Sequence, residues 1–159
     1  MNEIGFALFA GAALVLLFVF HRAETQRAAA IRGLAIRSGF HYLGDALPRS
    51  LTLYGTPFDH ASKVWNVIDG EPRGVRIIAF DCQNGVGKGS LRRTVIAVEG
   101  GSDLSLLLNP EMTIDSAGQW KVLYRPRAST NFRIAGLMPP EELEAYLNSV
   151  ATDAKKSGQ

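Results

Sequence analysis

The sequence predicts an α+β protein: a transmembrane helix continuing into a juxtamembrane helix, then an antiparallel meander of about six strands and a C-terminal amphipathic helix. Three observations predict this arrangement. Residues 4–20 carry no charged side chain. Short apolar segments bounded by turn-forming residues recur between residues 63 and 135, as in antiparallel sheets. A single helical stripe of apolar residues follows Pro139 and Pro140.

The first predicted element is a transmembrane anchor over residues 1–21. A helix rises about 1.5 Å per residue, so residues 4–20 and their flanks reach roughly 25 to 30 Å, the short end of a bilayer crossing. A cleaved signal peptide needs a basic start and a small-residue end, whereas Glu3 precedes this segment and bulky residues 18–20 close it. A buried helix of a soluble protein normally keeps a polar stripe, which this segment lacks. We therefore expect residues 4–20 to contact the lipid bilayer.

The second predicted element is a juxtamembrane basic helix over residues 22–39, with Gly39 as its C-cap. Its arginines recur every five residues, which scatters them around the helix, and we expect them to contact the membrane surface. The positive-inside rule then predicts a single-pass protein of the inner (cytoplasmic) membrane, with its N-terminus outside and its C-terminal domain in the cytoplasm. A lone cysteine, Cys82, agrees with a reducing compartment. The four arginines are Arg22, Arg27, Arg32 and Arg37.

The remaining chain predicts one cytoplasmic α+β domain over residues 40–156 and a disordered tail over residues 157–159. Residues 40–57 form a connection rich in glycine, proline and aspartate, which we expect to dock against the domain. Strands follow where apolar residues form short segments between turn-forming residues. The predicted strands are residues 63–68, 74–81, 94–98, 104–108, 121–124 and 132–135.

The C-terminal helix has the strongest helical pattern of the domain. Pro139 and Pro140 suit its first positions, and acidic residues 141 and 142 suit the positive end of the helix dipole. Leu143, Leu147 and Val150 are spaced as i, i+4 and i+7. This stripe should cover one face of the sheet.

A glycine-rich loop between two predicted strands, residues 85–90, partly matches a phosphate-binding loop. A P-loop has a glycine, then four further residues, then Gly-Lys-Ser or Gly-Lys-Thr, and it opens a helix. Here Cys82 stands at the first glycine position, Gly89 replaces the hydroxyl residue, and a strand follows. The loop is therefore predicted to be a hairpin connection. If this loop binds a ligand, we expect Lys88, Arg92 and Arg93 to form the site.

Catalytic and metal chemistry find little support in the sequence. Cys82, Asp81, His41 and His60 are residue types of a thiol hydrolase, but nothing in the sequence places them together. The three histidines are isolated and no second cysteine exists, which argues against a metal site. No catalytic, cofactor-binding or metal-binding residue is predicted, and no cofactor.

A nucleic-acid partner is not predicted either. Basic and acidic side chains balance beyond residue 37, so the domain has no net field to attract a polyanion. The net charge of +2 of the whole chain comes from the basic helix over residues 22–39.

The order of elements and three motifs resemble a group of uncharacterised bacterial single-pass membrane-anchored proteins. The motifs are residues 63–70, 75–81 and 85–88. The resemblance implies no activity, and Cys82 stands where that group is expected to carry an aromatic residue. Short strands closed by one C-terminal helix are also similar to pleckstrin-homology-like domains, at the level of fold alone.

These observations favour a non-enzymatic, membrane-tethered cytoplasmic domain that binds or scaffolds a protein partner or lipid headgroups. One alternative is a membrane-anchored enzyme that uses Cys82 or polar residues of the loop over residues 83–90. Another is an accessory subunit of a membrane complex, in which small residues such as Gly5 and Gly11 let another helix approach closely.

Overall fold

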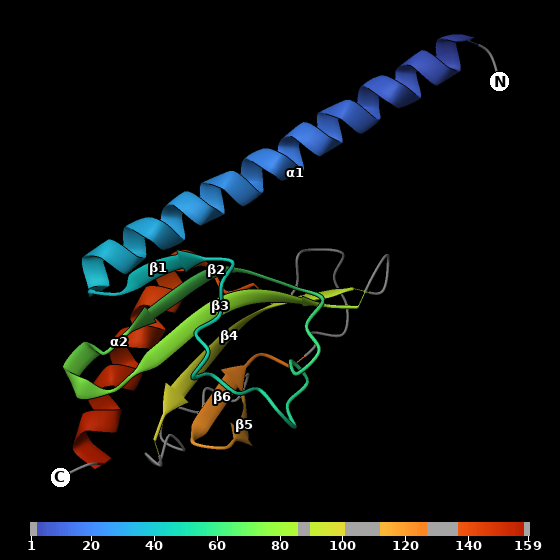
Figure 1. Cartoon of the computed structure of the whole chain (residues 1–159). Coiled ribbons are helices and arrows are strands. Elements are labelled where there is room, and N and C mark those ends of the chain that lie inside the picture. Colours follow the sequence, from blue (N-terminus) through green and yellow to red (C-terminus); the bar gives the residue numbers. More distant parts are fainter. Residues whose placement is uncertain (1–2, 86–89, 101–111, 127–136, 158–159) are drawn as a thin grey trace.

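The computed structural model describes residues 3–85, 90–100, 112–126 and 137–157, with side chains described between residues 9 and 152. It is an α+β fold with an antiparallel sheet, which confirms that part of the prediction (Figure 1). The elements in chain order are α1 (Glu3–Ser38), β1 (His41–Gly44), β2 (Lys63–Gly70), the 3-10 helix η1 (Pro72–Gly74), β3 (Ile77–Asn84), β4 (Leu91–Glu99), β5 (Thr113–Ala117), β6 (Trp120–Tyr124) and α2 (Pro140–Ser157).

The six described strands form one sheet in the order β1-β2-β3-β4-β6-β5, and every neighbouring pair is antiparallel. The central pair, β3 and β4, is in register along its whole length, from Ile77 opposite Val98 to Asn84 opposite Leu91. Because successive residues of a strand face opposite sides, β3 sends Ala79 and Asp81 to one face and Phe80 and Cys82 to the other.

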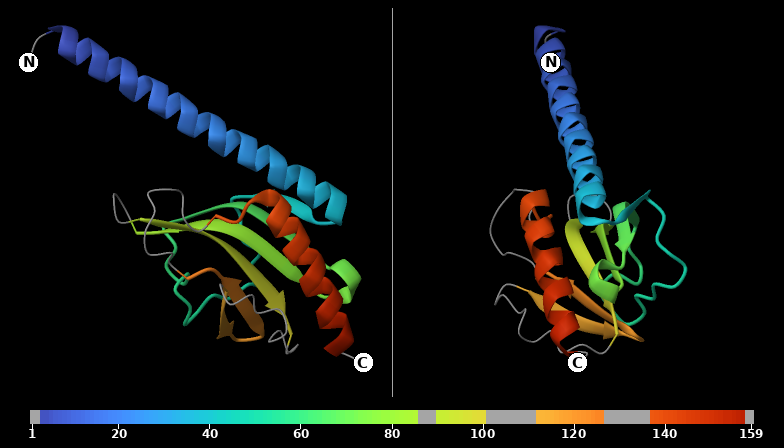
Figure 2. Two further views of the ribbon diagram at one scale, coloured as in Figure 1. Left: turned by 180° about the vertical axis from the view of Figure 1, so that it is seen from behind. Right: turned by 90° about the vertical axis from the view of Figure 1, so that its left-hand side faces the viewer.

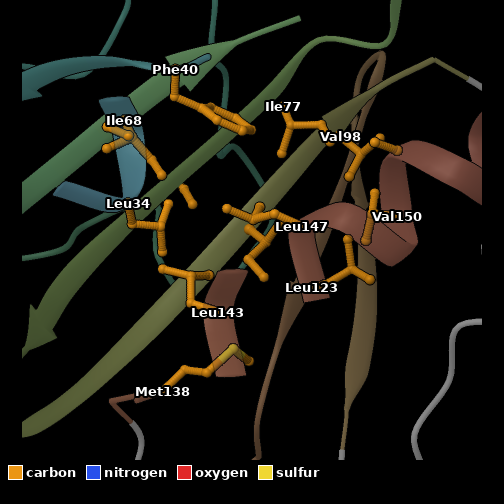
Figure 3. Packing of buried hydrophobic residues seen from close by; sticks show 14 of the residues in the cluster. Leu34, Phe40, Ile68, Ile77, Val98, Leu123, Met138, Leu143, Leu147 and Val150 are labelled. Carbon is orange, nitrogen blue, oxygen red and sulfur yellow. The ribbon is translucent and has the colours of Figure 1, made fainter. Parts of the chain in front are cut away.

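Both helices pack on the same face of the sheet. The C-terminal part of α1 contributes Leu34 to this core, and α2 contributes Leu143 and Leu147. Figure 3 shows these side chains pointing toward Ile68 of β2 and Val98 of β4. The predicted stripe of α2 therefore does cover the sheet, and α1 shares that face with it.

The connection between β1 and β2 docks against the domain, as predicted, and it does so on the face of the sheet opposite the helices. Phe58 of the connection is 1% exposed and lies edge-on to the Tyr124 ring, with ring centroids 4.8 Å apart. The Trp120 indole N–H donates a 3.1 Å hydrogen bond to the Ser50 carbonyl. This connection has no regular secondary structure. It closes a second hydrophobic core, on the face of the sheet opposite the helices, and gives the buried indole a polar partner.

Helix α1 ends at the predicted C-cap. Gly39 has φ of +74°, and the Phe40 amide donates a 2.8 Å bond back to the Ala35 carbonyl. This left-handed cap turns the chain directly into β1. Phe40 then packs on Gly70 so closely that a Cβ there would meet the Phe40 ring at 2.8 Å.

The prediction of a membrane-spanning helix is wrong. Among the residues that the structure describes, no helix combines the length and apolarity that crossing a membrane requires. This finding overturns the transmembrane anchor over residues 1–21 and the single-pass inner-membrane localisation. Of the predicted juxtamembrane helix over residues 22–39, residues 22–38 form the C-terminal part of one helix, α1, which ends at Ser38.

The predicted strands also need correction. The strand predicted at residues 74–81 begins at Ile77 instead, because η1 and the positive φ of Arg73 (+60°) occupy the preceding turn. Strands β1 and β5 were not predicted, whereas the strands predicted at residues 104–108 and 132–135 lie outside the described residues. The single C-terminal helix expected from the pleckstrin-homology-like order is joined by α1 on the same face.

Candidate functional site

One group of polar side chains is buried beneath α1, at the end of an otherwise apolar core. Asp81 of β3 is 1% exposed, and Thr94 of β4 lies directly opposite it. Arg27 reaches this pair from α1. We call the following group the Arg27 cluster: Arg27, Tyr42, Asn66, Asp81 and Thr94.

The Arg27 guanidinium makes hydrogen bonds with all three of its nitrogens. Nε and Nη2 donate to the two carboxylate oxygens of Asp81 at 2.7 and 2.8 Å, a bidentate ion pair. Nη2 also donates to the Thr94 hydroxyl at 3.1 Å, and Nη1 donates to the Met138 carbonyl at 2.8 Å. A bidentate pair with further hydrogen bonds offsets the desolvation cost of burying the two charges.

The remaining members complete the hydrogen bonding of Asp81. The Thr94 hydroxyl donates to Oδ1 at 2.8 Å, and the Asn66 amide donates to Oδ2 at 2.9 Å. The Tyr42 hydroxyl donates to the Asn66 side-chain oxygen at 3.1 Å. The Met138 amide donates to the Thr94 oxygen at 2.9 Å. The cluster therefore joins α1, four strands and the segment that enters α2.

A β-bulge in β2 turns Asn66 toward this cluster. The pairing of β2 with β3 shifts between Trp65, opposite Asp81, and Ile68, opposite Ala79, so that β2 carries one extra residue. Asn66 takes up the bulge with φ of +53°, a left-handed conformation that asparagine tolerates better than most residues. The extra residue of the bulge is thus a polar one, and its side-chain amide bonds to Asp81.

Two further ion pairs hold α1, and both are more exposed. Glu24 accepts a 2.8 Å bond from Arg92 of β4, and Arg37 pairs with Glu144 of α2 at 2.7 Å. The Arg37 hydrogen bond lowers the pKa of the Glu144 carboxyl. Between these pairs Leu34 is fully buried. The docked part of α1 is therefore residues 24–38.

Residues 9–20 of α1, where the described side chains begin, carry no charged group that could form such an ion pair. Figure 2 shows from two directions that this part of α1 runs clear of the sheet. Residues 9–20 carry bulky apolar side chains that are each at least 55% exposed. We call residues 9–20 the apolar arm. Its exposed bulky residues are Phe9, Leu14, Val15, Leu16, Leu17, Phe18, Val19 and Phe20.

The four arginines predicted to contact a membrane surface do not act as one set. Arg27 is committed to buried Asp81, and Arg37 pairs with Glu144. Arg32 stacks over the Tyr42 ring, 4.9 Å from its centroid, while Arg22 is exposed. Because a five-residue spacing scatters the arginines around the helix, three of them contact different partners within the fold.

The predicted loop site is not assembled in the described residues. Lys88 lies outside them. Arg92 and Arg93 are neighbours on β4 and so face opposite sides of the sheet. Arg92 contacts Glu24 and also stacks on the Trp65 ring, whereas Arg93 lies over the Phe58 and Tyr124 rings.

The thiol-enzyme alternative is opposed by the surroundings of Cys82. The cysteine is 1% exposed, and burial, followed by the charge of Asp81, raises its pKa to about 12. A thiol needs a lowered pKa and access to act as a nucleophile. His41 and His60 are exposed, so the structure does not bring them to this buried sulfur. Within the described ranges, no group of three or more His, Cys, Asp or Glu side chains is placed to hold a metal ion.

The sequence did not predict the Arg27 cluster, although it contains one signal of it. Asp81 is a charged residue at the end of an apolar strand, and a buried carboxylate needs a cationic partner. Arg27 lies 54 positions earlier in an alanine-rich helix that offers several equivalent arginines. Only the docking of α1 on the sheet selects the pair.

Comparisons of the chain with protein-family models, with curated proteins and with solved structures found no match. The resemblance to membrane-anchored bacterial proteins therefore stays a prediction.

Proposed function

We propose that the protein is a non-enzymatic binding or scaffolding domain that joins a larger protein assembly through the apolar arm. The observation that carries this proposal is the exposure of the arm. Residues 14–20 are seven consecutive bulky apolar side chains, so at about 100° per residue they point in every direction around the helix. Contiguous exposed apolar surface marks interaction sites, and a helix that is apolar on all sides is normally enclosed.

The energetics favour enclosure by several protein elements. Burying one large apolar side chain contributes about 1.5 to 3 kcal/mol, so eight of them supply roughly 12 to 24 kcal/mol. Association costs about 4 to 15 kcal/mol in lost freedom. A groove in one partner would cover a single side of the arm and gain only part of this energy. Helices that surround the arm would gain most of it.

The rest of the fold supports a structural role. The members of the Arg27 cluster form hydrogen bonds with one another and with the Met138 backbone, and Cys82 is buried with a raised pKa. These groups fix α1 on the domain and offer no reactive group to a substrate. The domain therefore serves as a rigid base for the arm.

A matched pair of substitutions on α1 tests the proposal. Leu17→Asp places a charge on the arm, and Ile36→Asp places the same charge on an equally bare position of the docked part, 76% exposed. Each full-length variant is produced in the source cells, and the size of the native particle that contains it is measured. We expect the wild type and Ile36→Asp in a large particle and Leu17→Asp as a free chain.

Two results would contradict the proposal. One is an unchanged large particle for Leu17→Asp. The other is a wild-type chain that associates with lipid vesicles while no protein accompanies it in the native particle.

A further inference from the structure

Three segments far apart in the sequence meet at one guanidinium: α1, the centre of the sheet and the residues that enter α2. We propose that the Arg27 cluster is a latch that holds α1 on the sheet and couples the docking of α1 to the start of α2. The proposal concerns the isolated chain and does not depend on what the apolar arm binds.

Burial distinguishes the latch from the other ion pairs of α1. The side chains of Arg27 and Asp81 are 14% and 2% exposed, against 61% and 28% for Arg37 and Glu144. Water screens the exposed pair, which therefore holds two helices together only weakly. The buried pair is screened much less, and its partners cannot be replaced by water while α1 is docked.

The cost of release is concentrated on one carboxylate. If α1 lifts away, Asp81 loses two of its four hydrogen bonds and the only positive charge among its described partners. Asn66 still points at Asp81 because the β-bulge fixes it there. The acceptor site is thus built into the sheet, and α1 supplies the matching donor. This arrangement favours two discrete states, docked and released.

The link to α2 runs through two bonds at one residue. Arg27 Nη1 donates to the Met138 carbonyl, and the Met138 amide donates to the Thr94 oxygen that also accepts from Arg27 Nη2. Met138 stands two residues before α2 begins at Pro140. Removal of the guanidinium therefore leaves the Met138 carbonyl without its Arg27 donor. It also removes one of the hydrogen bonds that hold the Thr94 hydroxyl in place. Release of α1 should loosen the entry into α2.

The experiment measures the position of α1 by the distance between two spin labels. Cysteines replace Leu17 and Tyr54, two exposed residues on the arm and on the connection, in a Cys82→Ala background. Arg27→Met is compared with the matched control Arg37→Met. We expect one narrow distance distribution for the parent and for Arg37→Met, and a distribution at least twice as broad for Arg27→Met.

A second variant keeps the test decisive if Arg27→Met does not fold. Arg27→Met with Asp81→Asn removes both charges, so no bare carboxylate remains to destabilise the core. The latch predicts that this double variant melts cooperatively and still shows the broad distribution. A narrow, parent-like distribution in the double variant would overturn the latch, because the pair would then matter for stability alone.

Hydrogen exchange of the Met138 amide tests the coupling separately. We expect exchange at least tenfold faster in the double variant than in the parent, and unchanged exchange in Arg37→Met. Broadened distances with a Met138 amide as protected as in the parent would overturn the link between α1 and α2.

Discussion

Asn66 is the residue at which local backbone and long-range pairing depend most on each other. Its left-handed φ of +53° is a conformation that β-branched residues adopt only with strain, yet it lies within a strand. The side-chain amide of the same residue donates a hydrogen bond to Asp81, and its side-chain oxygen accepts one from the Tyr42 hydroxyl. The sequence could not reveal this role, because asparagine between Trp65 and Val67 also fits an ordinary exposed strand position.

Two substitutions at this position separate the backbone from the hydrogen bonds. Asn66→Gly keeps the left-handed conformation and removes the side chain, whereas Asn66→Val removes the side-chain bonds and adds backbone strain of about 1 to 3 kcal/mol. We expect both variants to be less stable than the wild type, with Asn66→Val less stable than Asn66→Gly by about that strain. Urea unfolding measures the difference. Equal stability of the two variants would contradict the strained bulge.

Cys82 should behave as an inert core residue. Because burial raises its pKa to about 12, almost no thiolate exists at pH 8 in the folded chain. We expect iodoacetamide to modify it at least a hundredfold more slowly in the native protein than in urea. An exposed cysteine placed at Tyr54 in a Cys82→Ala background is the control for reagent activity. Rapid native modification of Cys82 would show that the second core is open.

Alkaline pH should destabilise the fold through two groups of the same hydrophobic cluster, Tyr124 and Cys82. Burial first, and then the Asp115 hydrogen bond, raises the pKa of Tyr124 from 10.0 to about 12, and burial raises that of Cys82 from 9.0 to about 12. Both groups are neutral when protonated, so their contribution is fully present below about pH 9 and is lost as the pH rises toward 12. Unfolding midpoints in urea between pH 8 and pH 12 should fall. In Tyr124→Phe with Cys82→Ala they should fall less steeply, and an identical slope would contradict the assignment.

Among the elements, α2 was the most readable from sequence and β1 and β5 the least. Its stripe at i, i+4 and i+7 places Leu143, Leu147 and Val150 in the core as predicted. Strand β1 has four residues and a bulge between Tyr42 and Gly44, and β5 carries Asp115 and an exposed Ser116 at the sheet edge. Edge strands with polar or irregular sequences lack the pattern that identifies a strand.

The packing of α2 gives a direct test. Leu147 is 1% exposed among side chains of α1 and the sheet, so Leu147→Asp would bury a charge with no partner there. We expect this variant to lose cooperative thermal melting. The adjacent exposed position provides the control, since Asn148→Asp places the same charge in water and should melt like the wild type. A cooperative, unshifted melt of Leu147→Asp would contradict the packing.

The molecule as a whole divides α1 into a docked part and a free one. The sequence showed that residues 4–20 differ from the rest of the chain in the surroundings they require, and the structure shows the described part of them exposed. What the sequence could not show is where α1 meets the domain. That depends on the pairing of Arg27 with Asp81 across 54 positions, which no local pattern encodes. From their regular spacing, the sequence predicted that Arg27 and the three other arginines of α1 contact the same surface. In the structure the surroundings of Arg27 differ from those of the other three.

Photo-crosslinking in the source cells tests the role of the apolar arm most directly. A photoreactive amino acid replaces Leu17 on the arm or Ile36 on the docked part of the same helix, both bare in the isolated chain. If the arm is enclosed by an assembly, Leu17 should yield discrete protein adducts of one or a few masses, and Ile36 should yield few or none. Equal adducts from the two positions, or adducts with lipid alone from Leu17, would contradict the proposed function.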